Sequence, residues 1–91
     1  MKSGAQYLAD ELERLISLPL NTKEDLEHWY TERYALEKVL ITKYPNFQYL
    51  HEVDHFFDDA DIRREDSDYR EWQHQRMLNY VACLRNETST N

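Results

Sequence analysis

Glycine and proline are nearly absent from this chain, and their scarcity constrains the fold more than any other feature. The sequence contains one glycine, Gly4, and two prolines, Pro19 and Pro45, among 91 residues. The turns of a multi-stranded sheet depend on these residue types, because glycine reaches the backbone angles that tight turns need and proline fixes them. The sequence therefore predicts helices and no sheet.

Four amphipathic segments are expected, because apolar side chains recur at the three- and four-residue spacing of one helix face. Ser3, Thr22, Asn46 and Ser67 can each cap the start of one segment, and Thr22 with Asp25 resembles a capping box. The four expected apolar faces are Leu8, Leu12, Leu15 and Ile16; Leu26, Trp29, Tyr30, Leu36, Leu40, Ile41 and Tyr44; Phe47, Leu50, Val53, Phe56 and Phe57; and Tyr69, Trp72, Tyr80, Val81 and Leu84. Short connections between such helices favour a small all-α antiparallel bundle of about four helices.

The chain is long enough for one domain with a single modest core, so we expect residues 1–91 to form one helical domain. The segment "DDADIRREDSD", residues 58–68, is interpreted as a linker between the third and fourth helices. The polar residues from about 87 onward are expected to fray. Cys83, the only cysteine, excludes an internal disulfide and is expected to be a buried thiol beside the last apolar face.

Acidic residues outnumber basic ones, with 18 Asp and Glu against 11 Lys and Arg and a net charge of −7. This balance disfavours direct binding of nucleic acid or of an anionic membrane, and it favours a basic protein partner. No apolar run resembles a signal peptide or a membrane span, so a cytoplasmic location is expected. No cofactor is expected, and no glycine-rich phosphate loop or nucleophile constellation indicates an enzyme.

The stretch "HEVDH", residues 51–55, matches H-E-x-x-H, in which two histidines one helical turn apart bind zinc. The spacing E-x-x-H also occurs twice, at Glu52 with His55 and at Glu71 with His74, as in di-iron helical bundles. A di-iron site would further need Glu37 with Glu11 or Glu13. On a helical wheel the motif residues lie away from the apolar faces, so we expect them to face solvent. A helical metal-binding protein using His51, Glu52, His55, Glu71 and His74 remains an alternative.

Residues 46–68 carry eight of the acidic residues and only Arg63 and Arg64 as bases. Asp58, Asp59 and Asp61 stand where the third helix should end, and negative charge there opposes the helix dipole by ~0.3–1 kcal/mol each. A placement that costs stability hints at function. The segment lacks the glycine and the ligand spacing of a calcium-binding EF-hand loop. The plainer interpretation is a solvated loop that Arg63 and Arg64 partly neutralise.

The leading hypothesis is a non-enzymatic acidic module that inhibits or regulates a basic partner, such as a nuclease or a nucleic-acid-binding protein. Its expected partner-binding residues are Asp54, Asp58, Asp59, Asp61, Glu65, Asp66 and Tyr49, with the tyrosine at the edge of the core. In size, charge and helix count the chain is similar to the small acidic immunity proteins of nuclease bacteriocins, but beyond the Tyr44-Pro45 dipeptide it matches none of their motifs, so the motifs identify no family. A structural homodimer, with the Arg33 and Glu37 pair at its interface, is the third hypothesis.

Overall fold

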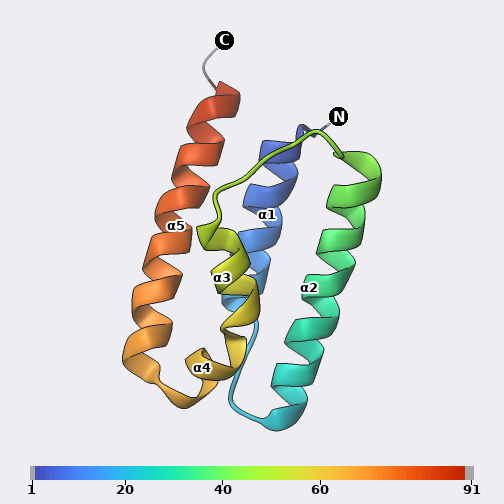
Figure 1. Cartoon of the computed structure of the whole chain (residues 1–91). Coiled ribbons are helices and arrows are strands. Elements are labelled where there is room, and N and C mark those ends of the chain that lie inside the picture. Colours follow the sequence, from blue (N-terminus) through green and yellow to red (C-terminus); the bar gives the residue numbers. More distant parts are fainter. Residues whose placement is uncertain (1, 90–91) are drawn as a thin grey trace.

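The computed structural model describes residues 2–89, and in that range the chain forms five helices and no strand (Figure 1). The helices are α1 (Gly4–Ser17), α2 (Lys23–Lys43), α3 (Glu52–Asp58), α4 (Ala60–Glu65) and α5 (Ser67–Ser89). Helices α1, α2, α3 and α5 alternate in direction, and α4 lies at the end of the bundle where α2 and α5 begin. The prediction of a small antiparallel all-α bundle is confirmed.

Both predicted caps of the first two helices are present. The Ser3 hydroxyl accepts a hydrogen bond from the Gln6 N–H at 3.1 Å, and the Gln6 side chain accepts one from the Ser3 N–H at 2.9 Å. The Thr22 hydroxyl accepts from the Asp25 N–H at 3.0 Å, and the Asp25 carboxylate accepts from the Thr22 N–H at 3.1 Å. Each box satisfies backbone donors that an uncapped helix would leave unpaired.

The third predicted helix is shorter than expected, and the predicted linker is largely helical. Residues 46–51 form no helix, and Asn46 caps none, because α3 begins only at Glu52. Phe47 lies against Gly4 of α1, and the Leu50 N–H donates to the Tyr80 hydroxyl at 3.2 Å, so this stretch is tied to the neighbouring helices instead. Residues 60–65, assigned to the linker, form α4.

Asp66, and not Ser67, caps α5. One carboxylate oxygen of Asp66 accepts the N–H groups of Asp68 and Tyr69, each at 3.0 Å. Helix α5 continues to Ser89. The tail that was predicted to fray from about residue 87 therefore starts within α5. Residues 90 and 91 of that tail lie outside the described part of the chain.

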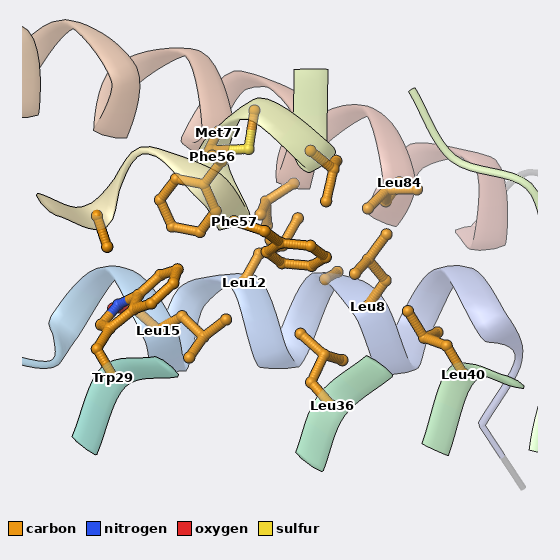
Figure 2. Packing of buried hydrophobic residues seen from close by; sticks show 14 of the residues in the cluster. Leu8, Leu12, Leu15, Trp29, Leu36, Leu40, Phe56, Phe57, Met77 and Leu84 are labelled. Atoms are coloured by element: carbon orange, nitrogen blue, oxygen red, sulfur yellow. The ribbon is translucent and has the colours of Figure 1, made fainter. Parts of the chain in front are cut away.

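The core is built around α1, as Figure 2 shows. Leucines of α1 lie between Trp29, Leu36 and Leu40 of α2 on one side and Phe56 and Phe57 of α3 on the other. The Trp29 indole N–H donates to a carbonyl of α1 at 3.0 Å, so its only polar group is satisfied although the ring is buried. No helix in residues 2–89 combines the length and the apolar content that crossing a membrane requires.

Four residues expected on apolar faces are exposed, namely Ile41, Leu50, Trp72 and Cys83. Ile41 follows Leu40, and the rotation of about 100° between adjacent helical residues turns Ile41 away from the core that Leu40 faces. On α5 the buried face runs through Gln73, Met77, Val81 and Leu84, one residue out of phase with Trp72. The same offset leaves Cys83 at the surface, so the prediction of a buried thiol is wrong.

Candidate functional site

The acidic residues singled out in the sequence gather around the junction of α3 and α4. Asp58 is the last residue of α3, and Asp61 lies in the first turn of α4. Asp58, Asp61 and Glu65 are exposed, and we call these three carboxylates the acidic turn. The Tyr30 hydroxyl of α2 donates to the Asp58 carbonyl at 3.3 Å, which fixes the junction against α2.

The break between the two helices changes the electrostatic argument made from the sequence. Because a new helix starts at Ala60, Asp61 lies in the first turn of α4 and not at the end of a longer helix. Negative charge is favourable at a helix start, so the expected dipole penalty for Asp61 is wrong. Asp59 is both the C-cap of α3 and the N-cap of α4, and Asp58 stands at the end of α3, where the Arg33 guanidinium compensates it at 3.1 Å.

Asp59 points away from the acidic turn, toward α5. Its carboxylate accepts the Tyr69 hydroxyl at 2.6 Å and the Gln73 amide at 3.2 Å, and the side chain is half-buried. The hydrogen bond to this carboxylate raises the pKa of Tyr69 above its usual value. Asp59 therefore joins α4 to α5, and the predicted patch is divided between two sides of the junction.

Arg63 is fully buried, which the sequence did not indicate. Its guanidinium donates to the Phe56 carbonyl and to the Gln73 amide oxygen, both at 2.6 Å, and lies 4.2 Å from the centre of the Phe56 ring. Two further guanidinium nitrogens, Nε and Nη2, have no hydrogen-bond partner within residues 2–89. Burial lowers the pKa of Arg63 to about 10, while Asp59 opposes the shift. Its charge is withdrawn from the surface that it was expected to neutralise.

The remaining predicted partner-binding residues have local partners. The Tyr49 hydroxyl donates to Asp54 at 3.4 Å, and the Tyr49 ring packs at the edge of the core, as predicted. Asp54 also lies 3.3 Å from His51. The Asp66 carboxylate already accepts hydrogen bonds from backbone N–H groups at the start of α5. Arg64, the second base of the segment, pairs with Glu65 at 3.0 Å, so one member of the acidic turn has an adjacent cation.

The two E-x-x-H motifs are not brought together into one site. The rings of His51 and His55 lie 4.8 Å apart at the surface, but Glu52 forms an ion pair with Arg76 of α5. Glu71 is exposed. Within residues 2–89 no three His, Cys, Asp or Glu side chains are grouped as metal ligands would be.

His74 does not face solvent as predicted. It is half-buried, with its ring centre 6.3 Å from that of Phe56. Burial lowers the pKa of His74 to about 4, and the nearby charges of Arg63 and Arg70 act in the same direction. This imidazole is therefore neutral at ordinary pH.

The carboxylates proposed to complete a di-iron site are engaged elsewhere. Glu11 pairs with Arg14 on the same helix, and Glu13 pairs with Arg85. Glu37 pairs with Arg33, as the sequence suggested for a margin of the bundle. Because Arg33 also contacts Asp58 and lies over the Phe57 ring, its charge is compensated within one chain without a second copy.

A hollow surface beside α5 went unpredicted, because it depends on the offset that exposes Trp72. Three depressions adjoin one another along α5, two of them bordered also by residues 50–59, and Arg76 lines all three. Trp72, 52% exposed, stands between the first and the second. The only sequence signal for such a surface was the number of Tyr and Trp residues, seven and two, in so short a chain.

Comparisons of the chain with protein-family models, with curated proteins and with solved structures give no significant match. The surface must be interpreted from its own chemistry.

Proposed function

We propose that this protein is a non-enzymatic binding module whose acidic turn engages a basic protein partner and inhibits or regulates it. The observation that carries the proposal is the burial of Arg63 beside exposed Asp58, Asp61 and Glu65. At the surface Arg64 pairs with Glu65, and Arg33 of α2 pairs with Asp58. The exposed Asp61 carboxylate forms no ion pair within residues 2–89, because the nearby Arg63 is buried, and it is the member of the acidic turn most open to a basic partner.

The physical basis of the proposal is electrostatic steering and occlusion. Clustered carboxylates accelerate encounter with a positively charged protein and fix its orientation. A nuclease or a nucleic-acid-binding protein carries such a positive surface where it holds phosphates. A module that covers this surface blocks the partner without any chemistry of its own.

The test compares two double variants that change the net charge equally. Asp61→Lys with Glu65→Lys reverses two carboxylates one turn apart on α4, while Glu24→Lys with Glu27→Lys reverses two exposed carboxylates of α2. Asp59 is left unchanged, because its hydrogen bonds to α5 would confound a reversal. Affinity for a basic probe protein, cytochrome c, is measured by calorimetry at low and at physiological ionic strength.

We expect the α4 variant to weaken binding about tenfold at low ionic strength, and the α2 variant to weaken it about two- to threefold through net charge alone. Circular dichroism should give the same helical content for both variants. Equal losses in the two variants would show that the acidic turn has no special importance. Failure of the unmodified protein to bind the probe would count against the proposal as a whole.

A further inference from the structure

Trp72 is the largest apolar side chain that the described surface exposes. It lies on α5, one helical turn after Tyr69 and one turn before Arg76. The Tyr69 ring centre is 5.6 Å from that of Trp72, and the Arg76 guanidinium lies 5.1 Å over the indole. The indole is thus held in place by its neighbours while half of its surface remains open to solvent.

Three shallow depressions adjoin one another at Arg76. Two lie between α5 and residues 50–59, and the third, on the other side of Trp72, is lined by α5 alone. We call the three together the Trp72 groove and define it by Leu50, Glu52, Asp68, Glu71, Trp72 and Arg76. Along α5 it extends from Asp68 to Cys83, which at 1.5 Å per residue is about 22 Å. An extended peptide of about seven residues would span that length.

Negative charge surrounds the groove. Glu52, Asp68 and Glu71 line it, and Asp59 borders it from the start of α4. Arg76 is the only cation among the lining residues, and it is already paired with Glu52. The carboxylates of Asp68 and Glu71, which lie together on one side of Trp72, form no ion pair with another residue in the range 2–89. An exposed indole beside such carboxylates is complementary to a cationic side chain.

Arg76 indicates which cation fits best. Its guanidinium lies over the Trp72 indole and pairs with the Glu52 carboxylate at the same time. A planar guanidinium can stack on a ring and donate in its own plane to a carboxylate, whereas the ammonium group of lysine is a point charge. The surface therefore already holds, from its own chain, the group that a ligand would present.

We propose that the Trp72 groove binds an extended basic segment of a partner protein, with an arginine of that segment displacing Arg76 from Trp72 and Glu52. The inference rests on the proposed function, because both require a basic protein partner. It adds a second contact surface, on the α5 side of the α3–α4 junction, and it names arginine as the residue that is recognised. Arg76 acts as an internal competitor for that position.

The test uses a short oligo-arginine peptide and an oligo-lysine peptide of equal length as probes. Affinity is measured by calorimetry, and the indole N–H signals of Trp72 and Trp29 are followed by NMR. Three single variants are compared with the unmodified protein: Trp72→Ala, Arg76→Gln and Arg70→Gln. Arg70 is the matched control, because its replacement removes the same charge from the same helix without touching the groove.

We expect the arginine peptide to bind more tightly than the lysine peptide and to shift the Trp72 signal, leaving that of Trp29 in place. Trp72→Ala should weaken arginine-peptide binding about two- to fivefold, because stacking of a cation on an exposed indole contributes that much. Arg76→Gln should strengthen it several-fold, and more than Arg70→Gln does. Thermal unfolding of the Trp72→Ala variant should match that of the unmodified protein, since the side chain is exposed.

Equal affinity for the two peptides, or unchanged binding by the Trp72→Ala variant, would overturn the inference. So would equal effects of Arg76→Gln and Arg70→Gln, or failure of both peptides to bind. If the groove variants have no effect while Asp61→Lys with Glu65→Lys still weakens cytochrome c binding, the groove is excluded and the acidic turn stands. The reverse pattern would exclude the acidic turn and retain the groove.

Discussion

At the scale of single residues, the complete burial of Arg63 departs most from what the composition of the chain suggests. Removing a guanidinium from water is expensive, and an arginine without a carboxylate partner must be compensated otherwise. Here the Phe56 carbonyl and the Gln73 amide oxygen accept two hydrogen bonds, and the rings of Phe56 and Trp29 lie 4.2 and 4.8 Å from the guanidinium carbon. The charge is held mainly by dipoles and aromatic faces.

Replacement of Arg63 distinguishes its packing from its polar contacts. Arg63→Ala should lower the free energy of unfolding by about 3–5 kcal/mol, because it leaves a cavity and two acceptors without a donor. Arg63→Met fills most of the volume but leaves the acceptors unpaired, so it should cost about 1–3 kcal/mol. Urea denaturation of the three proteins measures both differences. A methionine variant as stable as the unmodified protein would show that the hydrogen bonds and ring contacts give no net stabilisation.

At the scale of the helical elements, a loop residue, Phe47, restricts which residue can stand at the start of α1, where Gly4 lies. A Cβ atom added to Gly4 would lie 2.6 Å from Cγ and 2.8 Å from Cβ of Phe47. Such distances are far below van der Waals contact, and the Phe47 atoms involved lie close to its backbone, where movement is restricted. The stretch after Pro45 therefore crosses the start of α1 at a point where only glycine leaves room.

Gly4→Ala is accordingly expected to act in opposite directions in two backgrounds. In the unmodified protein it should destabilise by about 1–3 kcal/mol, because overpacking outweighs the better helix propensity of alanine. In a Phe47→Ala background the clash disappears, and the same change should be neutral or stabilising by up to about 1 kcal/mol. Thermal or urea unfolding of the four proteins forms the double-mutant cycle. Equal effects in both backgrounds would mean that the two residues are not coupled.

Local signals predicted the first two helices because their start signals are short-range. Ser3 with Gln6 and Thr22 with Asp25 form their caps with residues three positions away, so the pattern is complete within the sequence. The division of the third helix depends on contacts distant in sequence, such as Leu50 with Tyr80 and Asp59 with Tyr69. Helical periodicity alone could not give these contacts.

For the candidate site, the sequence predicted the density of charge but not which side chains are buried or exposed. A high density of Asp and Glu located the acidic turn, since charge can be counted without knowing the fold. The burial of Arg63 and the exposure of Trp72 both depend on which residues of α4 and α5 face the core. On α5 the polar Gln73 occupies a core position, where it accepts a hydrogen bond from Arg63 and donates one to Asp59. A hydrophobicity pattern assigns such a polar residue to the surface.

At the scale of the whole molecule, the acidic turn lies at one end of the bundle, outside the apolar core. The leucines of α1 occupy the centre of the core, between α2 and α3. The acidic turn lies at the end where α4 covers the bundle, away from the start of α1 and the end of α5 (Figure 1). Opposing charges, such as Arg85 with Asp10 at 3.1 Å, join α1 to α5 elsewhere. This arrangement lets one end carry negative charge without placing it in the core.

Because burial lowers the pKa of His74, this residue makes the stability of the whole protein depend on pH. Its pKa is about 4 in the folded chain, against an ordinary value of 6.5 that the unfolded chain should retain. Between these two pH values the unfolded state binds more protons than the folded state, so the free energy of unfolding rises with pH across this window. Acidification from pH 6.5 to about 4 should therefore destabilise the protein, with His74 contributing about 1–3 kcal/mol.

The contribution of His74 can be isolated with His74→Gln, which removes the titrating group and keeps a polar side chain of similar size. The absolute stability of this variant will also change, because the ring packs against Phe56, so the informative quantity is the slope of stability against pH. Urea denaturation at several pH values between 4 and 6.5 should give a flatter slope for the variant than for the unmodified protein. His55→Gln, at an exposed position, serves as the matched histidine control. Parallel slopes for all three proteins would mean that His74 is protonated as readily in the folded chain as in the unfolded one, and that its contact with Phe56 is open to water in solution.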